Sequence, residues 1–218
     1  MGMFFYFLWY YLYMTNIMIV IPVVDTNTQN FTNLIGDLSG NYVAENRIET
    51  SFEDGSEVET VVANPYIGVA NPDFSGNIIL VSHSEIDCPE NAQSVVVDGD
   101  LNIAKLWNAG IAHAGQNGAT HVVILNQASS VNPHMFSEAV LECNTPVINL
   151  SDGGCFIVTP EVAANETYKW WFADIDLFNN NEVGNFRKDF LDLVQDNRIP
   201  IEGYIQDLVD QDRANFTA

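Results

Sequence analysis

Short apolar runs of strand length recur along this chain, separated by helical patterns and polar loops. Residues 17–24, 77–82 and 120–126 are apolar almost throughout, instead of alternating with polar residues. Such runs are typical of parallel strands that are buried on both faces of a sheet. The pattern predicts an α/β fold with a single Rossmann-like, mostly parallel sheet flanked by helices.

Helical patterns lie between these runs. Residues 31–38 place apolar side chains at helical spacing after a polar stretch that can cap a helix, and Gly40 is expected to end it. Residues 101–114 and 133–142 show the same spacing. The other expected elements are strands over residues 94–98, 145–150 and 154–159 and helices over residues 160–164, 185–194 and 201–212.

An acidic insertion over residues 41–76 is expected to form a peripheral β-hairpin. Its two strand-like runs flank Asp54-Gly55, a dipeptide that favours a two-residue hairpin turn. The predicted organisation is therefore an α/β domain over residues 17–185 that contains this hairpin. An apolar extension over residues 1–16 precedes the domain, and a helical segment over residues 186–218 follows it.

Residues 3–14 are apolar and aromatic and contain no Lys or Arg. A secretory signal needs a positive first region, and a membrane span needs about 20 apolar residues. We favour a translation start at Met14 or Met18, or an extension foreign to the fold, and a signal anchor is the remaining alternative. The expected location is cytoplasmic, with membrane contact only if this run is a genuine anchor.

The charge balance limits the partners. Seven Lys and Arg residues against 29 Asp and Glu residues give a net charge of −22, which repels nucleic acids and anionic lipids. We therefore expect no nucleic-acid partner. A phosphorylated ligand would need a metal ion, a helix N-terminus or a rare local cation. The three cysteines show no metal-binding spacing, which favours a reducing compartment.

Polar residues follow each central strand directly. Asp25 follows the first strand, His83 and Ser84 follow the second, Asp100 follows the third, and residues 126–129 follow the fourth. Ligands of open α/β sheets bind beyond the carboxyl ends of the strands. These groups are therefore expected to line one cleft.

Three motifs occur in a fixed order along the chain. A helix with Asn102 ends in Asn108-Ala-Gly-Ile, the strand over residues 122–126 precedes Pro133, and an aromatic segment, Trp171-Phe-Ala-Asp-Ile-Asp-Leu, comes later. This order resembles family 2 glycosyltransferases over about residues 17–185. The resemblance implies the A-type, nucleotide-sugar-binding fold. It also implies inverting transfer of a sugar from a nucleotide-sugar donor to a glycan or another hydroxyl acceptor.

The resemblance gives roles to residues near the proposed acceptor. Asp174 matches the family's general base, and nearby aromatic rings would partly desolvate it and make it a stronger base. Asp176 would be a second acidic contact, Trp170 and Trp171 would stack on a sugar, and Gly154 would let the backbone approach the acceptor. Alternatively, Asp174 caps a turn and the aromatic residues belong to the core or to an interface.

Other residues are expected to face the donor. Asp25, His83 and Ser84 would approach the nucleotide, and Asn126 and Ser129 would face the diphosphate. Asp100 and Asn108 are further candidates for donor binding. Lys105 could neutralise the diphosphate, although it could equally pair locally with Asp98 or Asp100 on the surface.

The metal site of the family has no clear counterpart. Family members carry an acidic motif after the fourth strand, and its carboxylate binds Mn²⁺ or Mg²⁺ on the donor diphosphate. Residues 126–129 read Asn-Gln-Ala-Ser, without a carboxylate, whereas these cations prefer charged oxygen ligands. No metal ligand is assigned. A catalytically inactive binding or structural module with the same fold is the main alternative. A nucleotidyltransferase is less favoured, because no glycine-rich basic loop follows the first strand.

Overall fold

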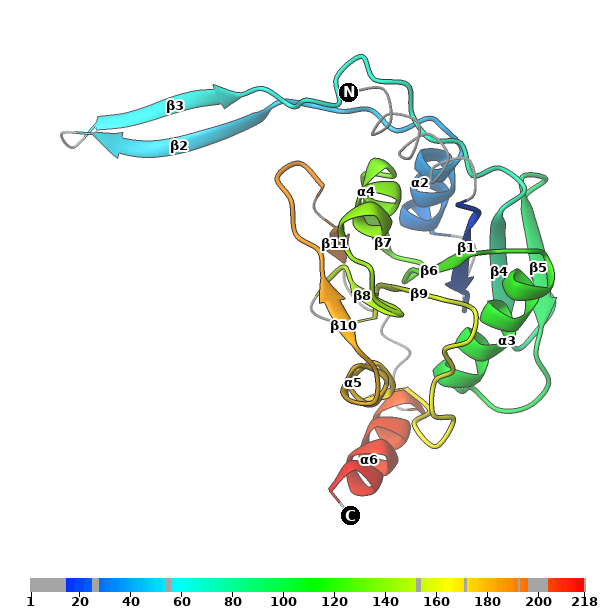
Figure 1. Ribbon diagram of the computed structural model, residues 1–218. Coiled ribbons are helices and arrows are strands. Elements are labelled where there is room, and N and C mark those ends of the chain that lie inside the picture. The colour runs from blue at the N-terminus through cyan, green and yellow to red at the C-terminus, as the bar shows by residue number, and fades with distance from the viewer. Residues whose placement is uncertain are drawn as a thin grey trace.

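The computed structural model describes residues 15–24, 28–53, 56–151, 154–170, 172–191, 193–195 and 204–217. Its main feature is a seven-stranded sheet with the order β10-β8-β9-β6-β1-β4-β5 (Figure 1). Strand β9 is antiparallel to both of its neighbours, and the other neighbouring pairs are parallel. The strands are β1 (Ile17–Pro22), β4 (Ile78–Ser82), β5 (Ala92–Val96), β6 (His121–Ile124), β8 (Val147–Asn149), β9 (Phe156–Val158) and β10 (Val183–Asn185). The predicted mostly parallel α/β sheet is confirmed.

Helices cover both faces of this sheet. In β1, Ile19 packs into the core that Phe136 of α4 shares, whereas Val20 packs into the opposite core with Trp107 of α3. Every residue of β1 is therefore buried, which explains why its sequence does not alternate. The helices are α2 (Gln29–Leu38), α3 (Ile103–Gln116), α4 (His134–Glu142), α5 (Ala173–Asn179) and α6 (Tyr204–Phe216).

Gly110 is the point where α3 lies against the sheet. A Cβ atom there would lie 2.4 Å from Val20 Cγ1 and 3.0 Å from Val81 Cγ2. We expect Gly110→Ala to lower the free energy of unfolding by about 1–3 kcal/mol, because the added methyl group overpacks the core. In α2, Gly36→Ala should instead raise it by up to about 1 kcal/mol, since the new Cβ meets nothing within 4 Å. Urea unfolding of both variants measures the difference, and equal effects would contradict this packing.

Two smaller sheets flank the main one. The hairpin of β2 (Arg47–Glu53) and β3 (Ser56–Val62) pairs from Arg47 with Val62 to Glu53 with Ser56 and extends away from the body (Figure 1). The predicted peripheral hairpin is confirmed. The second small sheet pairs β7 (Ser129–Val131) with β11 (Leu193–Gln195) in antiparallel fashion. This pair was not expected from the sequence.

Two predicted helices are wrong. Residues 160–164 form a turn, in which the Val162 N–H donates to the Thr159 carbonyl, and continue as an irregular segment. Within residues 185–194, β10 ends and β11 begins, and Phe190 has a left-handed φ of 64° that interrupts a helix. Long-range strand pairing overrides the local periodicity here. The helix predicted over residues 201–212 is present as α6.

The apolar run over residues 3–14 lies outside the described residues. Among the residues that the structure does describe, none of the helices has the length and apolar character needed to cross a membrane.

Candidate functional site

The strand order reverses between β1 and β6. From β1 the chain proceeds to β4 and β5 on one side of the sheet, and β6 then lies on the other side of β1. In open α/β sheets, ligands bind outside the carboxyl ends of the strands at such a reversal. The loops after β1 and β6 meet here, because the Val24 N–H donates a 2.6 Å hydrogen bond to Gln127 Oε1.

Predicted donor and acceptor residues lie together at this edge. The Asn126 N–H donates to Cys155 Sγ at 3.4 Å, and Ser129 Oγ lies 3.4 Å from the same sulfur. Next to Cys155, the Gly154 N–H donates to Asp174 Oδ2 at 3.3 Å. Because β9 is antiparallel, the residues that precede it lie at the carboxyl end of β6. We call Asn126, Ser129, Gly154, Cys155 and Asp174 the edge cluster.

Asp174 lies in the first turn of α5 and is partly exposed. Its Oδ1 accepts the N–H of Ile175 at 2.9 Å, while Oδ2 accepts from Gly154. The carboxylate thus helps to cap the turn, which was the alternative to a catalytic role. Asp174 is only partly buried, which is a requirement for any contact with a ligand hydroxyl.

The other predicted acceptor residues are not part of the edge cluster. Asp176 is half-buried in α5, two positions after Asp174. Trp170 is half-buried, and its backbone N–H donates to Asp212 Oδ2 at 2.7 Å. Trp171 and the predicted donor residue Asp25 lie outside the described residues.

His83 and Lys105 are engaged within the protein. His83 Nε2 accepts the Asn102 N–H at 3.1 Å, so Nδ1 carries the proton and donates to the Val97 carbonyl at 2.9 Å. The ring thereby joins β4, the end of β5 and the first residues of α3. Lys105 Nζ donates to the backbone carbonyl of Asp98 at 3.2 Å, which is a local contact but not an ion pair with the carboxylate of Asp98 or Asp100.

Asn108 also serves the fold. Its Nδ2 donates to the Ala164 carbonyl at 2.9 Å, and its Oδ1 accepts the Ala164 N–H at 2.8 Å. These bonds hold the loop after β9 against α3. Ser84 and Asp100 are exposed. The structure therefore does not bring these predicted donor residues into the edge cluster.

Helix α6 contributes a buried carboxylate that was not predicted from the sequence. Asp212 is fully buried, and its two oxygens accept the N–H groups of Lys169, at 2.9 Å, and Trp170, at 2.7 Å. In the same helix Phe216 stacks on Phe172, with ring centroids 4.6 Å apart. Helix α6 therefore holds the chain immediately before Asp174.

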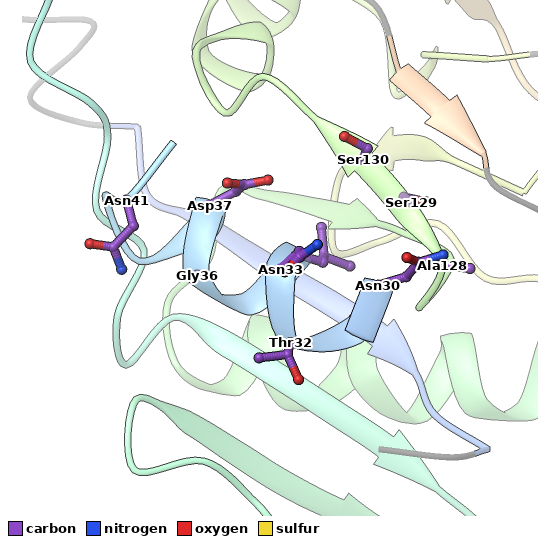
Figure 2. Close-up of a pocket in the computed structure, with 10 residues that line it drawn as sticks. Asn30, Thr32, Asn33, Gly36, Asp37, Asn41, Ala128, Ser129 and Ser130 are labelled. Carbon is purple, nitrogen blue, oxygen red and sulfur yellow. The ribbon is translucent and has the colours of Figure 1, made fainter. Parts of the chain in front are cut away.

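A groove opens between α2 and β7, with a cavity volume of about 390 Å³ (Figure 2). Ser129 belongs both to this groove and to the edge cluster. Figure 2 shows Asn30 beside Ala128 at one end of the groove and Asp37 nearer to Ser130 at the other. The lining residues are Asn30, Thr32, Asn33, Leu34, Gly36, Asp37, Asn41, Ala128, Ser129 and Ser130.

Burial raises the pKa of the Asp37 carboxyl above its ordinary value of 3.8. The folded state therefore favours the protonated form, and stability falls as the pH rises through the raised pKa. We expect Asp37→Asn to raise the melting temperature at about pH 7 and to have no effect at about pH 3, below both pKa values. Asp73→Asn is the control of opposite sign, because hydrogen bonds from Ser75 lower the pKa of Asp73. An equal gain from both variants would contradict this account.

Metal-binding side chains do not gather in the described part of the chain. Among those residues, no group of three or more His, Cys, Asp or Glu side chains could hold a metal ion. The side-chain oxygens of the edge cluster are one carboxylate, that of Asp174, together with the amide of Asn126 and the hydroxyl of Ser129. These residues do not fit a strong site for Mn²⁺ or Mg²⁺.

No protein family and no curated protein matches this sequence. Among solved structures, S. aureus TarS has a TM-score of 0.50 and 8% identity, and the match covers 80% of this chain and 36% of that one. A structure of TarS 1–349 in complex with UDP has a TM-score of 0.48 and 9% identity, with coverages of 79% and 58%. The chain thus spans less than two thirds of the TarS structures that it matches. At this identity the first likeness shows a shared fold and nothing more.

Proposed function

We propose that this chain transfers a sugar from a nucleotide-sugar donor to a hydroxyl acceptor at the edge cluster, with inversion at the anomeric carbon. The observation that carries the proposal is the position of Asp174. Its partly exposed carboxylate lies beside Gly154, at the carboxyl edge of a glycosyltransferase-like sheet. This edge is where ligands of open α/β sheets bind.

In the proposed reaction, Asp174 acts as general base. Its carboxylate takes the proton of the acceptor hydroxyl while the hydroxyl oxygen attacks the anomeric carbon. The bond between that carbon and the donor phosphate oxygen breaks on the opposite face, and the nucleoside diphosphate leaves with the bonding electrons. A base must lie about 2.6–3.2 Å from the proton-bearing oxygen that it serves. The hydrogen bond from Gly154 orients the carboxylate for this contact.

No step is assigned to a metal ion, because residues 126–129 carry no carboxylate and Asp174 is the one carboxylate of the edge cluster. Lys105 is the cation that the proposal places nearest to the diphosphate. To reach it, Nζ would exchange its bond to the Asp98 carbonyl for one to a phosphate oxygen.

A non-catalytic binding module is the second candidate. It is favoured by the sequence of residues 126–129, which offers no acidic group, and by the internal bonds that occupy His83 and Asn108. The two candidates differ in two measurable properties. A transferase binds a nucleotide sugar, and it transfers the sugar in a reaction that depends on Asp174.

A thermal-shift screen against UDP, GDP, CMP and dTDP sugars, with and without Mn²⁺, tests the donor. A ligand at about 100 times its dissociation constant adds about 2.7 kcal/mol, or about 5–10 °C for a chain of this size. We expect a shift with one nucleotide class that persists without Mn²⁺ and decreases in Lys105→Ala. A shift that requires Mn²⁺ would remove Lys105 from the account, and no shift with any donor would favour a module that binds no nucleotide sugar.

A further inference from the structure

The groove between α2 and β7 carries polar side chains that the fold does not use. The carboxylate of Asp37 and the side-chain amides of Asn30 and Asn41 form no hydrogen bond with any other described residue. The polar side-chain atoms of His83 and Asn108, by contrast, form hydrogen bonds within the protein. Unused donors and acceptors on a concave surface are available to a ligand.

The lining restricts the chemistry of that ligand. Asp37 is the one charged side chain among the described lining residues, and it is acidic, so the groove repels phosphates and other anions. No aromatic ring lines it among those residues, so a nucleobase finds no stacking partner there. Amide and hydroxyl groups such as those of Asn30 and Ser130 can both donate and accept hydrogen bonds, as the hydroxyls of a sugar do.

We propose that this groove binds a neutral polyhydroxyl ligand, a saccharide, along the surface of α2. Its volume of about 390 Å³ lies within the range of small-molecule sites, about 300–1,000 Å³. The half-buried carboxylate of Asp37 would accept hydrogen bonds from sugar hydroxyls. These bonds would replace the hydrogen bonds to water that the carboxylate loses through burial. This inference goes beyond the proposed transfer, because binding here requires neither a nucleotide nor Asp174.

Gly36 provides a sharp test because it lines the groove and has open space around it. Gly36→Gln adds a side chain that fills the groove without a clash in the core, and glutamine is a better helix former than glycine. Ala112→Gln is the matched control. It adds glutamine to an exposed position of α3, on the other face of the sheet.

The probes are methyl glucoside, methyl galactoside, methyl mannoside and methyl N-acetylglucosaminide, with glucose phosphate as the anionic comparison. In amide correlation spectra of the full chain, we expect at least one neutral probe to shift the amides of Asn30, Gly36, Asp37 and Ser130. Glucose phosphate should not shift them. The shifts should disappear in Gly36→Gln and persist in Ala112→Gln and Asp174→Asn.

The proposal is overturned if no neutral probe shifts these amides, if Gly36→Gln retains the shifts, or if glucose phosphate binds the groove equally well. These outcomes are distinguishable from failure of the proposed transfer. Saccharide shifts without any nucleotide binding would support the groove and contradict the transferase, and nucleotide binding without saccharide shifts would do the reverse.

Discussion

Asp174→Asn is expected to lower sugar transfer by about 10²–10⁴-fold, the range that a general base contributes, while donor binding stays unchanged. Asparagine has nearly the same shape and can keep one of the two bonds, from the backbone N–H of Gly154 or of Ile175, through its amide oxygen. It cannot take a proton from an acceptor hydroxyl. The loss should therefore appear in kcat, and the thermal shift with the donor should persist.

Asp176→Asn is the matched control for this variant. It makes the same chemical change two positions along α5, at a similarly half-buried carboxylate. We expect it to retain most of the activity if Asp176 is only an acceptor contact. Unchanged turnover in Asp174→Asn, or an equal loss in both variants, would remove Asp174 as the base. Transfer and donor affinity are measured together by following nucleoside diphosphate release at several donor concentrations.

The central sheet could be predicted because its pattern is local. In β1 and β4, burial on both faces requires an apolar residue at every position, and this requirement is visible in a few consecutive residues. The helix predicted over residues 185–194 was wrong, although it was also inferred from a local pattern. Its apolar residues have helical spacing, but Phe186 and Leu191 reach the core beside α2 and α4 from an irregular segment. The strand partner of β11 is β7, some 60 residues earlier, and no local pattern records that pairing.

Parts of the candidate site could be predicted from the sequence, and other parts could not. Asn126 and Ser129 could be proposed from the sequence because they directly follow a buried strand, whose carboxyl end is a common binding edge. The groove could not, because Asp37 and Ser130 become neighbours only when α2 packs beside β7. The internal hydrogen bonds of His83 and Asn108 could not be predicted either, since their partners lie on other loops. Polar residue type alone does not reveal whether a side chain serves the fold or a ligand.

Asp212 is expected to be the residue of α6 on which the position of Asp174 most depends. Asp212→Ala removes a fully buried acceptor and leaves the partly buried backbone N–H groups of Lys169 and Trp170 without it. An unpaired buried group costs about 1–3 kcal/mol, and water can reach these partly buried ones, so we expect a loss of about 1–3 kcal/mol in the free energy of unfolding. The stacking of Phe216 on Phe172 should weaken as well, because both contacts join α6 to the same loop.

Local hydrogen exchange separates this positioning role from a general loss of stability. In Asp212→Ala, the amides of Lys169 and Trp170 should exchange faster than those of β1 and β6, and kcat should fall more than donor affinity. Asp210→Ala in the same helix is the control, because its exposed pair with Arg213 contributes less than about 1 kcal/mol. If exchange rises uniformly across the sheet, Asp212 stabilises the whole fold. A rise confined to the loop before α5 would mean that α6 holds the carboxylate of Asp174 in place, and activity would then depend on a helix that contributes no residue to the edge cluster.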